Sequence, residues 1–324
     1  MRELQFTVPP EFDGARGKFF LRSFCGLSYH MVLELKQVQN GVTADGMLLR
    51  TIDRVHAGQT VVIRLPSERE RPQQAVEIHV PVLYEDEDVL VFDKPPFMPV
   101  HPSAGHADDT LANAAASYLQ QKGEAATFRP VNRLDRNTSG IVVTAKHTHA
   151  AYALTGAVQK AYLAVVQGIL TGEGTIDAPL RHKEGHGIRR EIGEGGERAV
   201  THWKALSQGN GHTLLAIWLE TGRTHQIRAH FSSLGYPLAG DDMYDGSTEL
   251  IARHALHCGR AVFPQPVNKK LILLHSPIPQ DFCGLLQVCG FNFETAEDGL
   301  ISYFEMNCLD MTEGTGDGYG IKTD

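Results

Sequence analysis

Cysteine is scarce in this sequence, because 324 residues contain only five, widely spaced and without a Cys-x-x-Cys pair. An odd number of scattered thiols argues against a disulfide framework or a structural zinc site, and reduced cysteines are typical of the cytoplasm. Long apolar runs are also missing, since no stretch approaches the roughly 20 apolar residues of a membrane span. The N-terminus lacks the apolar segment of a signal peptide. We therefore expect a cytoplasmic protein.

Two sets of enzyme signatures are absent as well. The sequence contains neither a Gly-x-x-x-x-Gly-Lys-Ser/Thr loop nor a dinucleotide-binding glycine fingerprint, which argues against a nucleotide-binding enzyme. It also lacks His-Glu-x-x-His. Its sixteen histidines include His254 and His257 beside Cys258, but their spacing is irregular for a metal site. We expect no cofactor and no metal.

Positive charge is in short supply, since 30 basic residues stand against 38 acidic ones, for a net charge of −8. The excess of acid lies in the C-terminal part, where residues from Asp281 onward contain nine acids and only Lys322 as a base. Residues 1–280 are neutral as a whole. Any RNA binding by this chain therefore has to come from local basic clusters.

Residues 17–66 have the pattern of a small separate unit. Helices are predicted at 18–22 and 27–36, the second with Ser28 as its N-cap, and strands with turns at 41–46 and 55–66. The polar stretch 67–74 indicates a linker. We expect a first module at 1–70, a linker at 71–80, a main domain with a C-terminal extension at 81–305, and a flexible acidic tail at 306–324.

The main domain combines hairpins with a few helices. Residues 82–94 indicate a hairpin whose acidic turn, Glu85–Asp88, we expect to be solvated. Helices are predicted at 110–119 with Asp109 as N-cap, at 149–158, and at 224–234 with Ile227, Phe231 and Leu234 inward and Gly235 after the C-cap. Strands are predicted at 141–145, 161–168, 199–206, 214–220, 255–263 and 271–275. Without regular β-α-β alternation, this order predicts an α+β fold.

Three segments concentrate unusual chemistry. In 129–140, Asp135 lies between Arg133 and Arg136 and is followed by Thr-Ser-Gly, which suits an active-site loop, although a surface ion pair explains this segment alone. Strand 160–168 places Tyr162 on one face, where a core tyrosine is the simpler interpretation. In 221–230, Arg228 follows a polar helix start that suits either an anion site or a solvated face.

In this order and spacing, the three segments resemble the RluA-type pseudouridine synthases of the bacterial ribosomal large subunit. The resemblance spans about residues 80–280 and rests on Arg-Leu-Asp-Arg-Asn-Thr-Ser-Gly, Lys-x-Tyr and Gly-Arg-Thr-His-Gln-Ile-Arg, with further matches at 94–102, 240–244 and 253–257. It implies a core with a mixed, largely antiparallel sheet. Residues 17–66 are similar, less strongly, to the small S4-like α/β module that binds RNA in such enzymes.

The resemblance implies an isomerase that converts specific uridines of ribosomal or transfer RNA to pseudouridine without a cofactor or a metal. It implies that Asp135 is the catalytic nucleophile or base, that Arg228 pairs with it, and that Tyr162 stacks on the flipped base. Tyr162 is also a candidate acceptor of the C5 proton, and Arg133 would fill the gap left by the base. Further RNA contacts are expected from Arg136, Thr138, Arg223, His225, Gln226 and Lys94.

Two positions depart from many relatives: Asn132 stands where histidine is common, and Phe97 where glycine is common. The alternative function is a non-catalytic RNA-binding protein of the same fold that aids ribosome assembly. Such a binder has no need of Asp135, and the intact set of Asp135, Tyr162 and Arg228 favours the enzyme. We expect a monomer whose partner is RNA, with no membrane contact.

Overall fold

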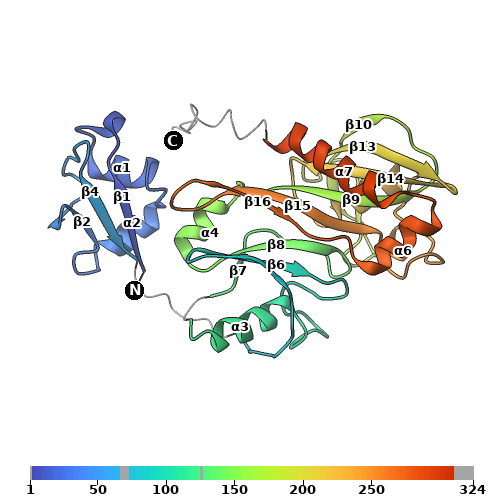
Figure 1. Ribbon diagram of the computed structural model, residues 1–324, viewed down its shortest axis with the longest axis horizontal. Coiled ribbons are helices and arrows are strands. Elements are labelled where there is room, and N and C mark those ends of the chain that lie inside the picture. Colours follow the sequence, from blue (N-terminus) through green and yellow to red (C-terminus); the bar gives the residue numbers. More distant parts are fainter. Residues whose placement is uncertain (1, 66–72, 125–126, 310–324) are drawn as a thin grey trace.

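The computed structural model describes residues 2–65, 73–124 and 127–309, and Figure 1 shows a small N-terminal unit beside a larger domain. The sheet of the small unit is antiparallel and has the order β1 (Glu3–Thr7), β4 (Thr60–Arg64), β2 (Val42–Ala44) and β3 (Met47–Leu48). Helices α1 (Gly17–Ser23) and α2 (Tyr29–Leu35) complete a separate apolar core with it. Ser28 Oγ accepts the N–H of Met31 at 3.2 Å, which confirms the predicted N-cap.

The larger domain is built on a ten-stranded sheet in the order β10-β13-β14-β9-β15-β8-β6-β5, with β16 also paired to β15 and β7 to β8. Neighbouring strands are antiparallel except β15 and β8, which run parallel at His257 and Ser139. The predicted α+β fold with a mixed, largely antiparallel sheet is therefore confirmed. The strands are β5 (Val82–Glu85), β6 (Val89–Lys94), β7 (Arg129–Pro130), β8 (Ser139–Ala145), β9 (Gln159–Gln167), β10 (Glu173–Asp177), β13 (Val200–Gly209), β14 (His212–Leu219), β15 (Leu256–Pro264) and β16 (Leu271–His275).

Strand β9 separates two hydrophobic cores. Tyr162, Ala164 and Val166 face the core that α3 and α5 complete, whereas Leu163 and Val165 face the core that α6 and α7 complete. Alternate side chains of a strand point to opposite faces, so this alternation follows from the sequence. The remaining elements are α3 (Leu111–Gln121), α4 (Thr148–Leu154), α5 (Gln226–Ser233), α6 (Gln280–Val288), α7 (Phe293–Phe304), the hairpin β11 (Leu180–His182) with β12 (Arg190–Ile192), and the short helices Pro10–Phe12 and Asp242–Tyr244.

Several local predictions are wrong. Helix α3 is capped by Thr110 rather than Asp109, because the side chains of Thr110 and Asn113 each accept the other's backbone N–H. Leu234 is 48% exposed, since α5 ends at the preceding residue, and α4 ends at Leu154 instead of continuing to 158. Strands β1 and β10 to β12 and helices α6 and α7 have no counterpart in the sequence-based prediction.

The acidic turn between β5 and β6 is solvated as predicted at Glu87 but not at Asp88. Asp88 is only 2% exposed and accepts hydrogen bonds from His147 Nε2 at 2.8 Å and from Gln265 Nε2 at 2.6 Å. Burial alone would raise the pKa of Asp88, but these hydrogen bonds outweigh it and lower the pKa to about 2. Glu85, at the other end of the turn, binds two lysine ammonium groups, those of Lys122 and Lys146. These acids hold distant segments together.

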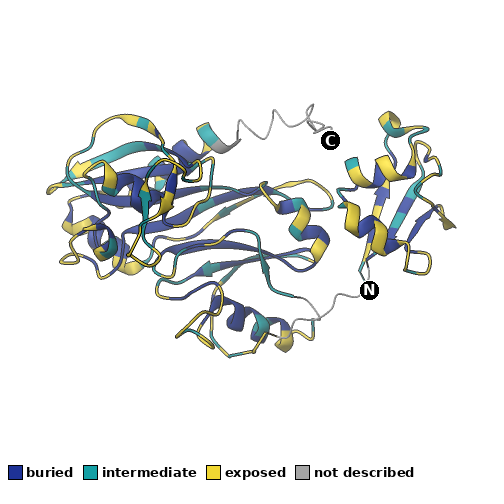
Figure 2. Cartoon of the chain, turned by 180° about the vertical axis from the view of Figure 1, so that it is seen from behind, coloured by how far each residue is buried: buried dark blue, intermediate teal, exposed yellow. Residues whose placement is uncertain are grey.

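The small unit contacts the larger domain beside α4 and the β15–β16 hairpin (Figure 2). His149 Nε2 donates a hydrogen bond of 2.8 Å to the carbonyl oxygen of Cys25, and Arg2 Nη2 donates one of 3.1 Å to Asp88. Val267, in the β15–β16 loop, packs against the core of the small unit. Because His149 is fully buried, burial lowers its pKa to about 4.

The predicted linker at 67–74 lies mostly outside the described residues, and so do residues 310–324 of the predicted tail. The first residues of that tail continue α7 as the π-helical turn Glu305–Leu309. In the part of the chain that the structure describes, no helix is both long enough and apolar enough to cross a membrane.

Replacing His149 with alanine should release the small unit from the larger domain. In wild type the docked state favours neutral His149, since the pKa is about 4 when docked and about 6.5 when the imidazole is exposed to water. Docking should be strongest above pH 6.5 and should lose up to about 3 kcal/mol as the pH falls towards 4. Small-angle scattering should show wild type expanding over that range and His149→Ala already expanded at pH 7.

The matched control is Tyr152→Ala, because Tyr152 is an exposed residue of the same helix. It should keep the radius of gyration of wild type. Equal radii for wild type and His149→Ala at pH 7 would show that the histidine does not hold the unit in place.

Candidate active site

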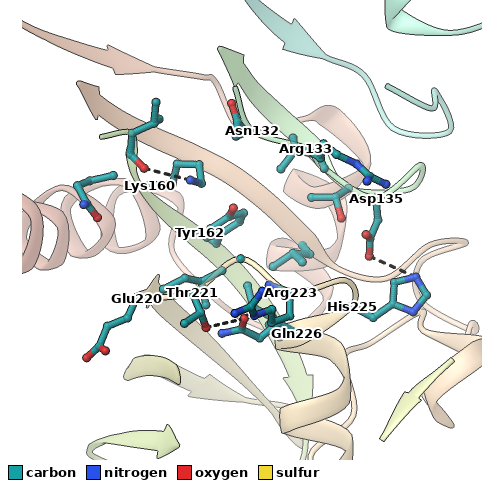
Figure 3. A pocket seen from close by; sticks show the side chains of 18 of the residues that line it. Asn132, Arg133, Asp135, Lys160, Tyr162, Glu220, Thr221, Arg223, His225 and Gln226 are labelled. Atoms are coloured by element: carbon teal, nitrogen blue, oxygen red, sulfur yellow. Dashed lines mark hydrogen bonds and ion pairs between the residues drawn. The ribbon is translucent and has the colours of Figure 1, made fainter. Parts of the chain in front are cut away.

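A pocket of about 380 Å³ opens between β9, the start of α5 and the loop of residues 131–138, which we name the Asp135 loop. Asp135, Tyr162 and Arg228, the three groups predicted to be catalytic, all line it. Figure 3 shows Asp135 facing His225 on one side of this pocket, with Tyr162 farther along its wall. The structure therefore brings together residues that are 93 positions apart in the chain.

The Asp135 loop is fixed where it enters β8. Gly140 has a φ of +110°, and a Cβ atom on it would lie 2.2 Å from the carbonyl oxygen of Cys258, so only glycine allows β8 to approach β15 here. On the other side, the Asn132 amide donates to Ile141 O at 3.0 Å and accepts the N–H of Val143 at 2.8 Å. The asparagine found in place of histidine thus pairs with β8 as a strand backbone does.

Arg228 is a buried cation between two carboxylates. Its Nε and Nη2 donate to Asp241 at 2.7 and 2.8 Å, and its Nη1 donates to Asp135 Oδ2 at 3.0 Å. Burial alone would lower the pKa of Arg228, but Asp241, which is 0% exposed, and Asp135 outweigh it and raise the pKa further above its usual value. The planar fork of the guanidinium therefore fixes the direction from which Asp135 is held.

His225 precedes α5 in a left-handed conformation, with a φ of +56° that is uncommon for a residue other than glycine. Its Nδ1 lies 3.1 Å from Tyr244 Oη, which also accepts the N–H of Arg190 at 2.7 Å. The Nε2 atom of the same ring lies 3.9 Å from Asp135 Oδ2. Burial lowers the pKa of His225, so the ring is neutral at pH 7.

Tyr162 is nearly fully buried on β9, where it is paired with Cys258 of the neighbouring strand β15. Burial, reinforced by Cys258, raises the pKa of Tyr162 well above its usual value. The phenol therefore stays protonated at neutral pH. This favours a stacking role and counts against a phenolate that accepts the C5 proton.

The residues predicted to contact RNA divide into two groups. Arg133 and Arg223 are exposed at the pocket, and His225 lines it. Arg136 is exposed beside the pocket, where its guanidinium contacts His106 and Asn137. These four side chains lie at or beside the pocket, and their contact with RNA stays a prediction.

The other three residues with a predicted RNA contact, Lys94, Thr138 and Gln226, are buried, and that contact stays a prediction. Lys94 is 0% exposed and donates to three backbone carbonyl groups. Thr138 is buried with its Oγ1 2.7 Å from His254 Nε2. Gln226 is buried as well, and both ends of its amide bind protein groups. Buried polar groups need such partners, so these three side chains support the site from within.

Asp241 and Tyr244 are site residues to which the sequence assigned no role. Asp241 fixes Arg228, and the ring of Tyr244 lies 4.9 Å from its guanidinium carbon, within range of a cation–π contact. Both fall in the segment 240–244, whose match to the family was the one sequence feature that could have pointed to them as site residues. Gly240 permits this arrangement, because a Cβ atom there would lie 2.0 Å from the carbonyl oxygen of Arg253.

The histidines considered for a metal site have other partners. His254 contacts Thr138, and His257 lies 3.0 Å from Ser139 Oγ and 3.1 Å from the carbonyl oxygen of Ser276. Among residues 2–65, 73–124 and 127–309, no three histidine, cysteine or acidic side chains are grouped in a way that could hold a metal ion.

Residues 88–233 match the family described as RNA pseudouridylate synthase. The ribosomal large subunit pseudouridine synthase D of Pseudomonas aeruginosa is 36% identical over 269 residues, which cover 76% of this chain and 83% of that protein. An uncharacterised RNA pseudouridine synthase of Bacillus subtilis, YjbO, is 36% identical over 269 residues, covering 81% of this chain and 95% of that protein. The structure of human RNA pseudouridylate synthase domain containing 1 matches with a TM-score of 0.52 and 26% identity, over 62% of this chain and 84% of that one. With this likeness over most of its length, the chain belongs to the RluA-type RNA pseudouridine synthases, isomerases that act on RNA.

Proposed function

We propose that this enzyme converts a uridine of large-subunit ribosomal RNA to pseudouridine, with the Asp135 carboxylate as its reactive group. The observation that carries the proposal is the ion pair between Asp135 and buried Arg228 at the wall of a pocket that Tyr162 also lines. The name of the Pseudomonas aeruginosa relative supports ribosomal RNA as the substrate. The free cysteines of the described residues support a cytoplasmic setting.

The reaction breaks the N1–C1′ bond of uridine, turns the uracil and forms a C5–C1′ bond. The C5 proton is lost and N1 gains a proton, so the reaction is redox-neutral and consumes no water. Asp135 acts either as the nucleophile at C1′ or as the base that removes a proton, and both roles need the ionised carboxylate. Arg228 donates to Oδ2, which leaves Oδ1 as the carboxylate oxygen available to the substrate.

A uridine within a helix cannot be rearranged, so the base has to leave the stack and enter the pocket. The pocket volume of about 380 Å³ lies within the usual range of about 300–1,000 Å³ for small-molecule sites. Four basic side chains line the pocket against two acidic ones, which favours a polyanion although the whole chain carries −8. Stacking on Tyr162 recovers part of the cost of flipping. Exposed Arg133, at the mouth, fills the space left in the RNA.

The N-terminal unit supplies a second RNA contact in this proposal, as an S4-like module. Helices α1 and α2 expose Lys18, Phe19, Arg22 and Tyr29, and Lys36 follows α2. Lys18 Nζ lies 5.8 Å from the centre of the Tyr29 ring. Basic groups interleaved with aromatic ones suit a polynucleotide, because phosphates bind the former and bases stack on the latter.

Replacing Asp135 with asparagine should abolish activity. The amide preserves the shape of the side chain but cannot act as a nucleophile or as a base, so the rate should fall by at least about 10³-fold. The measurement is tritium release from large-subunit ribosomal RNA labelled at uridine C5. Wild type should release tritium, and Asp135→Asn should release none above background.

Asp108→Asn is the control, because Asp108 is exposed on a loop of the same domain. It should release tritium at the wild-type rate. Equal release by Asp135→Asn and wild type would refute the role of Asp135. Release from transfer RNA alone would refute the choice of substrate, and no release from any RNA by wild type would favour a non-catalytic binder.

Tyr162 variants separate stacking from proton transfer. Tyr162→Phe keeps the aromatic face, so kcat should fall by less than about 10-fold. Tyr162→Leu loses stacking of about 1–3 kcal/mol, and kcat/KM should fall by about 10- to 100-fold. A phenylalanine variant as inactive as Asp135→Asn would instead assign the hydroxyl to proton transfer.

Removing three positive charges from the N-terminal unit should weaken RNA binding without slowing the chemical step. The triple variant Lys18→Gln/Arg22→Gln/Lys36→Gln should raise KM for RNA, leave kcat unchanged and reduce the dependence of log KM on log salt by about 2 units. Arg64→Gln is the control within the same unit, because Arg64 already binds Glu3 at 2.7 Å. An unchanged salt dependence in the triple variant would mean that α1 and α2 do not contact the phosphates.

A further inference from the structure

Three successive residues of the Asp135 loop are held by buried side chains from elsewhere in the chain. Lys94 Nζ donates to the carbonyl oxygen of Arg136, and His254 Nε2 lies 2.7 Å from Thr138 Oγ1. Between them, Arg253 Nη1 donates to the carbonyl oxygen of Asn137 at 3.1 Å. Of these three side chains, Arg253 is the one that also binds a residue of the C-terminal helices, Asp281 of α6.

Arg253 is held by a carboxylate. Its side chain is 0% exposed, and its Nε and Nη2 donate to Asp281 at 2.6 and 3.0 Å. This leaves Nη1 to donate to Asn137 O, and also to Leu256 O at 3.2 Å. Because the guanidinium is planar, the bidentate pair with Asp281 sets the direction in which Nη1 points.

Asp281 lies in the first turn of α6, where it also accepts the backbone N–H of Phe282 at 2.8 Å. Phe282, Leu285 and Leu286 of this helix are buried in the core against β9 and α7. Figure 1 shows α6 and α7 together at the end of the domain where β9 and β14 also lie. The carboxylate is therefore carried by a packed helix, although it is itself 38% exposed.

The contact between Arg253 and the loop repeats the geometry at Arg228. In both arginines, Nε and Nη2 bind one aspartate and Nη1 reaches the Asp135 loop, at Asp135 itself or at Asn137. The two meet at Gly240, since this glycine packs on the backbone of Arg253 and precedes Asp241. The contacts that hold the Asp135 loop on either side of its carboxylate therefore meet at one segment, the one around Gly240.

We propose that Asp281 is a positioning residue for the reaction: through Arg253 and the carbonyl group of Asn137 it holds the Asp135 loop where the carboxylate meets Arg228. The inference rests on the role proposed above for Asp135. It gives the acid-rich C-terminal part of the chain a share in the active site. Asp281 does not touch the substrate, and its effect is on the placement of Asp135.

Asp281→Asn tests the inference, because the amide cannot accept two charge-assisted hydrogen bonds from Arg253. A loop displaced by an ångström costs about 10- to 100-fold in rate. We expect kcat for tritium release to fall by that factor while KM for RNA stays within about two-fold, at a temperature well below the unfolding midpoint. Asp281→Glu, which restores a carboxylate, should recover at least part of kcat. The exposed Asp298→Asn on α7 is the matched control and should behave as wild type.

A purely structural role is distinguished by the double variant Arg253→Met/Asp281→Leu. Removing both charges avoids the uncompensated buried arginine that a single substitution leaves, so the protein should fold. If the pair positions the loop, the double variant should unfold near the wild-type temperature and still have the reduced kcat. Wild-type kcat in the folded double variant, or in Asp281→Asn, would overturn the inference. Asp135→Asn reports on the proposed function separately, because its activity would refute that function whatever Asp281 does.

Discussion

The active site depends on one buried guanidinium. Removing the charge of Arg228 from water is unfavourable unless carboxylates surround it in good geometry, and Asp241 provides two of the hydrogen bonds that do so. Asp241 is itself fully buried. Its two hydrogen bonds with the planar guanidinium therefore set the direction of Nη1, the atom that binds Asp135. The ring of Tyr244 makes a cation–π contact with this group, and His225 lines the same pocket from a left-handed turn. Of the two aspartates that bind Arg228, Asp135 is the one that lines the pocket.

Rigidity of the Asp135 loop comes from the sheet as well as from charge. The loop leaves β7, is matched to β8 by the amide of Asn132, and enters β8 through a glycine that lies against β15. Buried Lys94 and Arg253 then satisfy backbone carbonyl groups that the turn leaves without a strand partner. The loop that carries Asp135 is thereby held by contacts with the sheet and with buried cations.

Local patterns predicted many of the elements, although not β1, β10 to β12, α6 or α7, and family order predicted the meeting of Asp135 with Arg228. The alternation around Tyr162 gave the two faces of β9, because period-two burial is a local property. Long-range partners were not predictable in this way. Asp88 looks like a solvated turn residue until Gln265 approaches from 177 positions away. Lys94 likewise looks like a phosphate ligand, because the local sequence does not show that its side chain is buried. The apolar spacing of Phe282, Leu285 and Leu286 was missed because the segment after Asp281 was judged by its excess of acidic residues.

Strand β9 has a consequence for how this enzyme can change over time. It carries Tyr162 towards the pocket and Leu163 towards the C-terminal helices, so these two neighbouring residues belong to different cores. Inserting or deleting one residue before Tyr162 would turn the aromatic ring towards α7 and put an aliphatic side chain in the pocket. The strand can therefore accept substitutions but not changes of length. A change of length would be better tolerated in a connection such as the β11–β12 turn, whereas the pleat of β9 fixes the spacing between Lys160 and Tyr162.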